Sequence, residues 1–142
     1  MNQIFSSTFL TYEEVLEIHA DQISRYGGHS GIRDQSLLQS ALAQPEAIYG
    51  EEWLHPTIES QAAAYLYHLV KNHPFVDGNK RIGIACCLIF LEINGRELDP
   101  TLDDEDESTG HTRLEEVVLK VVTGEMKKDE LTTFLLKHSR EA

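Results

Sequence analysis

The feature that most constrains the fold is a run of ten residues without a charged side chain, IGIACCLIFL at 82–91. In a chain of 142 residues in which 25% of the side chains are charged, such a run is expected to be buried. It is too short to span a bilayer. Periodicity alone does not separate a buried strand from a buried helix here, but length and the stop signal of Asn94 and Gly95 favour a helix over 82–93. A helix that is apolar on every side belongs at the centre of a domain.

Further helices around this segment are predicted from caps, breakers and the spacing of apolar residues. Thr11 with Glu14, and Thr112 with Glu115, have the spacing of capping boxes, which satisfy free backbone N–H groups at a helix start. The expected helices run from Thr11 to Gly27, Asp34 to Pro45, Thr57 to Asn72 and Thr112 to Gly124, with a short one around 131–135. The chain is therefore predicted to be an all-α protein with one domain over 1–142.

One segment does not follow the helical pattern. Residues 46–55, EAIYGEEWLH, lie between two prolines and contain two short aromatic-containing runs around Gly50. This pattern fits either a small β-hairpin or a loop.

Charge and cysteine content limit the classes of partner. Twelve Lys and Arg against 24 Asp and Glu give a formal net charge of −12, which repels phosphate backbones and argues against a nucleic-acid binder. Any anion site must therefore be built locally. Cys86 and Cys87 are adjacent within the apolar run, as expected for core residues of a reduced protein. The first ten residues lack the pattern of a signal peptide, so we expect a cytoplasmic protein with no membrane segment.

Immediately before the apolar run lies HPFVDGNKR at 73–81, which is suited to binding an anion. A loop that enters a buried helix directs unpaired backbone N–H groups and the positive end of the helix dipole at one place. Gly78 and Asn79 tolerate the backbone conformations that form an anion nest. Lys80 and Arg81 add two cations, and the arginine fork matches the geometry of phosphate.

The same nine residues contain a base and a metal ligand. His73 can accept a proton near neutral pH, and Asp77 can hold Mg²⁺ together with phosphate oxygens. A base, a metal ligand and a phosphate cradle together indicate a nucleotide-using transferase. Each residue also has a structural explanation, in which the loop is an ordinary helix entry with a packed histidine and two solvated cations. Because all five polar residues adjoin one buried helix, the functional interpretation is the stronger.

Other candidate motifs are weak. The acidic run DDEDE at 103–107 is better explained as a solvated loop than as a metal site. The remaining histidines show no zinc spacing, and neither a Walker A loop nor a GxGxxG motif occurs.

The loop resembles the signature of the Fic/Doc family (filamentation-induced and death-on-curing proteins), HxFx(D/E)(G/A)N(G/K)R, at every position. The segment ISRYGG at 23–28 is also similar to death-on-curing toxins. The resemblance implies a Fic/Doc helical domain that uses ATP or another nucleoside triphosphate. His73 is then the base that deprotonates a target hydroxyl, and Asp77 is the Mg²⁺ ligand. The phosphates are then bound by Gly78, Asn79, Lys80 and Arg81, the last two also acting in catalysis.

The residue before the final arginine divides this family. Members with glycine there transfer AMP to a hydroxyl, whereas death-on-curing toxins carry lysine and transfer the γ-phosphate, with elongation factor Tu the known kind of target. Lys80 therefore implies a protein kinase. Pro74 and Gly78 are closer to the AMP-transferring form of the signature, so AMP transfer remains an alternative. A catalytically silent binding module is the third.

The resemblance also bears on regulation and target binding. Self-inhibited members carry an inhibitory glutamate followed by Gly or Asn, and no glutamate in this chain has either neighbour. Inhibition is then expected from a separate antitoxin of the prevents-host-death type. The family carries a flap that docks the target backbone as an added strand, and residues 46–55 occupy the corresponding place in the sequence.

Overall fold

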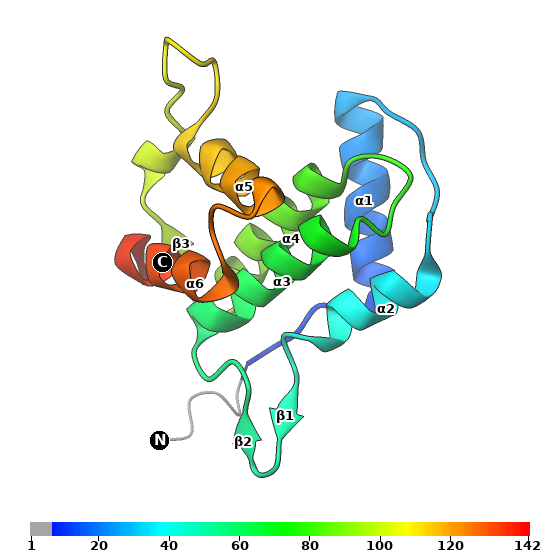
Figure 1. Cartoon of the computed structure of the whole chain (residues 1–142), viewed down its shortest axis with the longest axis vertical. Coiled ribbons are helices and arrows are strands. Elements are labelled where there is room, and N and C mark those ends of the chain that lie inside the picture. The colour runs from blue at the N-terminus through cyan, green and yellow to red at the C-terminus, as the bar shows by residue number, and fades with distance from the viewer. Residues whose placement is uncertain (1–6) are drawn as a thin grey trace.

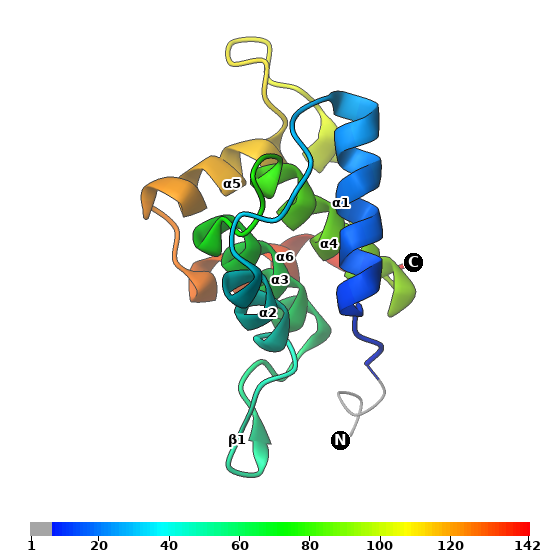
Figure 2. The same ribbon diagram turned by 90° about the vertical axis from the view of Figure 1, so that its right-hand side faces the viewer.

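The computed structural model describes residues 7–142 and is mainly helical (Figures 1 and 2). The helices are α1 (Tyr12–Tyr26), α2 (Gln35–Ala43), α3 (Ile58–Asn72), α4 (Asn79–Ile93), α5 (Arg113–Thr123) and α6 (Lys128–His138), with a 3₁₀ turn, η2, at Pro100–Asp103. The strands are β1 (Ile48–Tyr49) and β2 (Glu52–Trp53), which form a hairpin, and β3 (Arg96–Leu98) and β4 (Ser139–Glu141). The predicted helical class and the possible hairpin are both confirmed. The N-terminal segment judged to lack a signal peptide lies partly outside the described residues.

The predicted helix ends are explained by local hydrogen bonds. Thr11, Thr57 and Thr112 each cap a helix through a side-chain oxygen that accepts the N–H group three residues later. Asp34 does the same for α2. At the other end of α5, Gly124 adopts a left-handed conformation, φ 84°, that ends the helix.

The apolar run forms the central helix α4, as predicted, but this helix begins at Asn79, three residues before the predicted start. It packs against α1 and α3, and α3 in turn contacts α2, α5 and α6. One face of α4 is not fully buried: the side chains of Ile84, Ala85, Leu88 and Ile89 line an open groove between α1 and α5. The expectation that every face would be covered is therefore wrong for this face, because no other described helix lies over it.

The two central helices approach closely at Gly83. A Cβ atom at this position would lie 2.9 Å from Val70 Cγ2 and 3.4 Å from the carbonyl oxygen of Leu66. The absence of a side chain thus lets α4 lie against α3. This contact fixes the end of α3 relative to the start of α4.

A second small sheet, which the sequence did not predict, ties the C-terminus to α3. β3 and β4 pair in antiparallel register, with Glu97 opposite Arg140. Beneath them the buried carboxylate of Glu59 accepts hydrogen bonds from Arg96 Nε at 3.0 Å and Ser139 Oγ at 2.6 Å. The three side chains are far apart in sequence, so no local pattern indicated the contact.

The hairpin lies at the opposite end of α3 from residues 73–78 (Figures 1 and 2). Its base is anchored by aromatic stacking, because the Phe9 ring lies 5.8 Å from Trp53 and 5.6 Å from Phe90. A helix of 15 residues separates the two segments by about 22 Å at 1.5 Å per residue. Residues 46–55 are therefore not adjacent to the 73–81 loop, and their role in docking a target stays a prediction.

In the described part of the chain, no helix combines the length and hydropathy that a membrane span requires.

Replacing Gly83 with alanine is expected to lower the free energy of unfolding by about 1–3 kcal/mol, because the new methyl group overlaps Val70. This sign opposes helix propensity, which favours alanine over glycine by about 1 kcal/mol. Chemical denaturation measures the difference. As a control, Ala85→Gly on the half-buried face should lower the free energy of unfolding only by the difference in helix propensity, about 1 kcal/mol. A Gly83→Ala protein more stable than the wild type would contradict this account of the packing.

Candidate functional site

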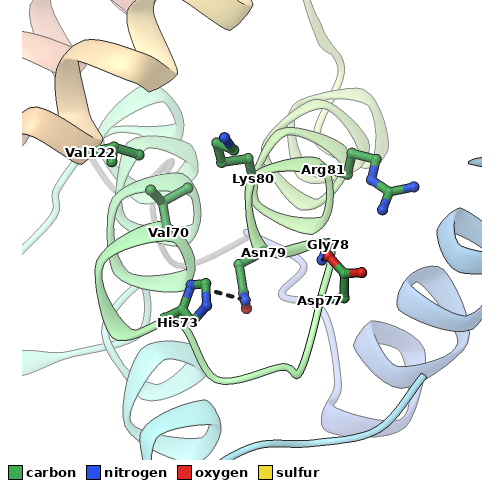
Figure 3. A pocket seen from close by; sticks show the side chains of 8 residues that line it. All are labelled: Val70, His73, Asp77, Gly78, Asn79, Lys80, Arg81 and Val122. Carbon is green, nitrogen blue, oxygen red and sulfur yellow. Dashed lines mark hydrogen bonds between the residues drawn. The ribbon is translucent and has the colours of Figure 1, made fainter. Parts of the chain in front are cut away.

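The polar residues singled out in the 73–81 loop line one hollow between the end of α3 and the start of α4 (Figure 3). It has a volume of about 440 Å³. The lining residues are Val70, His73, Asp77, Gly78, Asn79, Lys80, Arg81 and Val122. The six polar-loop residues predicted from sequence are thus brought together. Val70 and Val122 form an apolar wall that the sequence did not indicate, because helical spacing does not show which apolar residues border a cavity.

The start of α4 has the features of an anion site. Gly78 caps the helix in a left-handed conformation, φ 78°, and provides no side-chain cap. The first bond of the helix runs from the Ile82 N–H group to the Gly78 carbonyl at 2.9 Å. The N–H groups of Asn79, Lys80 and Arg81 precede that bond and lie at the positive end of the helix dipole. A phosphate in the hollow can accept hydrogen bonds from this turn.

Two cations extend this turn (Figure 3). The side chain of Lys80 is exposed and makes no hydrogen bond or ion pair with any other residue between 7 and 142. Arg81 donates one long hydrogen bond, 3.4 Å, from Nη1 to the carbonyl oxygen of Gln22. Most of its donors are therefore available to an anion. Because the chain carries a net charge of −12, this local positive potential must come from these groups and the helix end.

The backbone of His73 is held in an uncommon conformation. Its φ of 51° and ψ of 53° are left-handed, and it is the only non-glycine residue with positive φ among residues 7–142. Arg33 stabilises this turn, since Nε donates to the His73 carbonyl at 2.7 Å and Nη2 to the Asn72 carbonyl at 3.0 Å. Such conformations cost about 1–3 kcal/mol and are found most often where the backbone positions a functional group.

The Asn79 side chain fixes both the loop and the His73 ring. Asn79 Oδ1 accepts the Phe75 N–H group at 2.9 Å, and Nδ2 donates to the Phe75 carbonyl at 3.0 Å. These two bonds fix which end of the amide carries the hydrogens. Nδ2 also lies 3.1 Å from His73 Nδ1, so Nδ1 must be the acceptor. In the neutral ring the hydrogen is then on Nε2.

This arrangement has a consequence for proton transfer. Nδ1 cannot take a proton while the Asn79 hydrogen occupies its lone pair. In the other neutral tautomer Nε2 has the free lone pair, but the hydrogen is then on Nδ1. This hydrogen would point at the N–H group of the Asn79 amide, and two donors cannot form a hydrogen bond. The exposed His73 ring must therefore leave Asn79 before it acts as a base, whichever nitrogen accepts the proton.

Asp77 is held ionised by backbone donors. Its Oδ2 accepts the His29 N–H group at 3.2 Å, and its Oδ1 accepts the Gly78 N–H group at 2.9 Å. These bonds, that from His29 foremost, lower the pKa of Asp77, and the charge of Arg81 acts in the same direction. Each oxygen keeps a further acceptor site, which suits a hard cation such as Mg²⁺. Residues 7–142 contain no cluster of three ligating side chains, so the other ligands would be phosphate and water.

The segment 27–34, between α1 and α2, borders the loop along its length. Gly31 O accepts the Val76 N–H group at 3.0 Å, and Ile32 forms an antiparallel bridge with Phe75. Gly28 is required next to the carboxylate, because a Cβ atom there would lie 2.8 Å from Asp77 Oδ2. The sequence pattern placed a helix end at Gly27 and gave no role to Gly31. Their density in the sequence GGHSG was the available signal of a close backbone approach.

Comparison with known proteins identifies relatives over most of the chain. A model of the Fic/DOC family matches residues 9–91. The chain is 36% identical over 128 residues to "Toxin Doc" of Mycolicibacterium smegmatis, covering 89% of this chain and 90% of that protein. It is 33% identical over 94 residues to "Protein kinase doc" of Escherichia phage P1, covering 65% of this chain and 74% of that protein.

The hydrogen bond from Asn79 predicts the tautomer of His73. In a long-range ¹H–¹⁵N correlation spectrum of the free protein, neutral His73 should show a protonated Nε2 and a bare Nδ1. Asn79→Ala should remove this preference and give a mixture of tautomers. A wild-type spectrum with the hydrogen on Nδ1 would show that the Asn79 contact is not a hydrogen bond in solution.

Proposed function

This chain belongs to the Fic/DOC family, and on that basis we propose that it is a death-on-curing type toxin with protein kinase activity. It transfers the γ-phosphate of ATP or another nucleoside triphosphate to a hydroxyl side chain of a target protein. The observation that carries the proposal is the first turn of α4, whose free N–H groups lie beside Lys80 and Arg81 at the hollow that His73 also lines. The names of the two relatives, a toxin and a protein kinase, support the same assignment.

The proposed reaction uses His73 as the base. The target hydroxyl oxygen forms a bond to the γ-phosphorus while the bond between that phosphorus and the β,γ-bridging oxygen breaks. The hydroxyl proton passes to the His73 ring, and the nucleoside diphosphate leaves with the bridging oxygen. The N–H groups of residues 79–81 stabilise the negative charge on the transferred phosphoryl group.

A divalent cation fits this site. The ionised Asp77 would hold Mg²⁺, which supplies charge neutralisation between the phosphate groups. Asp77 is held in place by its two backbone donors, so its carboxylate needs no other side chain to position it.

Lys80 supports phosphate transfer over AMP transfer. Its ammonium group has no partner among residues 7–142 and lies at the mouth of the hollow, where a glycine would leave open space. In an AMP-transferring pose the outer phosphates would occupy that space. A lysine there should favour the reversed pose, in which the γ-phosphate faces His73.

An antitoxin partner follows from the toxin assignment. Among residues 7–142 no glutamate side chain lines the hollow, so inhibition must come from outside it. The groove between α1 and α5 shares Arg81 with the hollow and has an apolar floor on α4. An amphipathic antitoxin helix in this groove would cover Arg81. We place the reaction in the cytoplasm, which is consistent with two buried cysteines that form no disulfide.

The reaction is tested by the position of the label. With γ-labelled ATP the target in a cell lysate should become labelled, whereas α-labelled ATP should give no labelled protein. His73→Ala should reduce the transfer by about 10²–10⁴-fold, the usual contribution of a general base. Label from the α position alone would establish AMP transfer, and no label from either would indicate a binding module.

A Lys80→Gly variant provides the matched test of the phosphate pose. Loss of the ammonium group should abolish γ-phosphate transfer, because nothing then disfavours the AMP-transferring pose. Lys71→Gly, an exposed lysine in the last turn of α3, controls for the loss of one positive charge. Full kinase activity in Lys80→Gly would mean that this side chain does not set the pose.

The toxin assignment predicts an effect on growth. Expressed alone in a bacterial host, the wild-type chain should arrest growth, and His73→Ala at the same protein level should not. We expect an antitoxin gene beside this one, and its co-expression should restore growth. Normal growth with a wild-type chain that is shown to be folded and abundant would contradict the assignment.

A further inference from the structure

We infer that His19, a buried histidine on α1 outside the 73–81 loop, is a positioning residue that holds the phosphate cradle in its active shape. The inference rests on the proposed function of that loop. Neither the contacts nor the role of His19 was indicated by the sequence, in which this residue belongs to no motif.

His19 contacts the loop in two ways. Its Nε2 lies 2.8 Å from the carbonyl oxygen of Asp77. Its ring stacks on Phe75 with the centroids 3.8 Å apart and the planes inclined by 10°. Only 4% of His19 is exposed, so both contacts are formed away from solvent. A carbonyl oxygen only accepts hydrogen bonds, and Nε2 must therefore carry the hydrogen.

The hydrogen bond fixes one peptide plane. In a trans peptide the C=O and N–H groups point in opposite directions. With the Asp77 carbonyl directed at His19, the N–H group of Gly78 points the other way, where it meets Asp77 Oδ1 at 2.9 Å. Both ends of this peptide are thus held.

The peptide needs such a restraint because Gly78 does not supply one. Glycine populates positive and negative φ about equally, so the plane of the peptide between residues 77 and 78 could reorient about the flanking single bonds at little cost. Gly78 is the cap of α4, and its φ of 78° aims the N–H groups of the following turn at the hollow. Rotation of the peptide would also break the bond from Gly78 to the Asp77 carboxylate. Without His19 the cradle would be populated only part of the time.

The stacked ring adds a second restraint. Phe75 is 1% exposed, and both its backbone N–H and carbonyl groups are bonded to Asn79. His19 therefore holds both ends of the segment 75–77. It stacks on the ring of Phe75 at one end and donates a hydrogen bond to the carbonyl of Asp77 at the other. A substitution that preserves only one of these contacts should separate their contributions.

The experiment compares variants that keep or lose the N–H donor. His19→Gln and His19→Met have similar length, but only glutamine can donate to the Asp77 carbonyl. His19→Phe keeps a flat ring against Phe75 and lacks the donor. His55→Phe is the control, because His55 is also buried, 5% exposed, and bonds a backbone carbonyl, that of Gln44, near the hairpin. Melting temperature, the Kd for ATP with Mg²⁺, and kcat and KM are measured for each.

The Kd for ATP should rise by about three- to tenfold in His19→Phe and His19→Met, the size expected for one hydrogen bond. In His19→Gln it should stay within about twofold of the wild type, and in His55→Phe it should not change. Equal affinity of the glutamine and methionine variants, with both folded, would overturn the inference. If His19→Phe does not fold, the comparison of glutamine with methionine still decides.

A failure of the proposed function can be distinguished from a failure of the positioning role of His19. If the wild-type chain binds neither ATP nor another nucleoside triphosphate, the proposed kinase activity is wrong, and the Gly78 amide signal in an ¹H–¹⁵N spectrum then tests His19. This signal should shift in His19→Met and not in His19→Gln, since only the methionine variant releases the peptide plane. An unchanged Gly78 signal in the methionine variant would overturn the positioning role.

Discussion

The reversal of the chain between α3 and α4 is the constraint on which the site depends. Six residues, 73–78, turn the backbone from the end of one central helix to the start of the other, and the turn has left-handed residues at both ends, His73 and Gly78. The Asn79 amide ties the middle of the turn through Phe75. Because both helices are fixed in the core by their contact at Gly83, the turn has one geometry in which to place a base opposite a phosphate cradle.

The support for this turn comes from outside the nine-residue motif. Arg33 holds the strained His73 backbone, the N–H group of His29 holds Asp77, and His19 holds the peptide that follows it. All three belong to α1 or to the segment between α1 and α2, which passes in front of the loop in Figure 2. The N-terminal third of the chain is thus the scaffold of the site, and the motif residues alone do not define its geometry.

Sequence reasoning succeeded where the signal is local. The helix cap at Thr11 and the helix formed by the apolar run after Arg81 depend on interactions between residues close in sequence. Their structure therefore follows from a few adjacent residues. It failed where a contact joins distant segments. The β3–β4 sheet, the bond from His19 to Asp77 and the position of the hairpin away from the site all depend on tertiary packing. The motif residues were found because they are contiguous, whereas the residues that hold them are spread over 19–33.

The central claim is that the turn at the start of α4 binds the γ-phosphate in a cradle that exists before the nucleotide arrives. A crystal structure with Mg²⁺ and a non-hydrolysable ATP analogue tests it most directly. The γ-phosphate should lie within hydrogen-bonding distance of the N–H groups of residues 79–81. The backbone of 75–78 should be unchanged, with the His73 ring released from Asn79. An α-phosphate in that place, or a cradle that forms only by rearrangement of 75–78, would contradict the account.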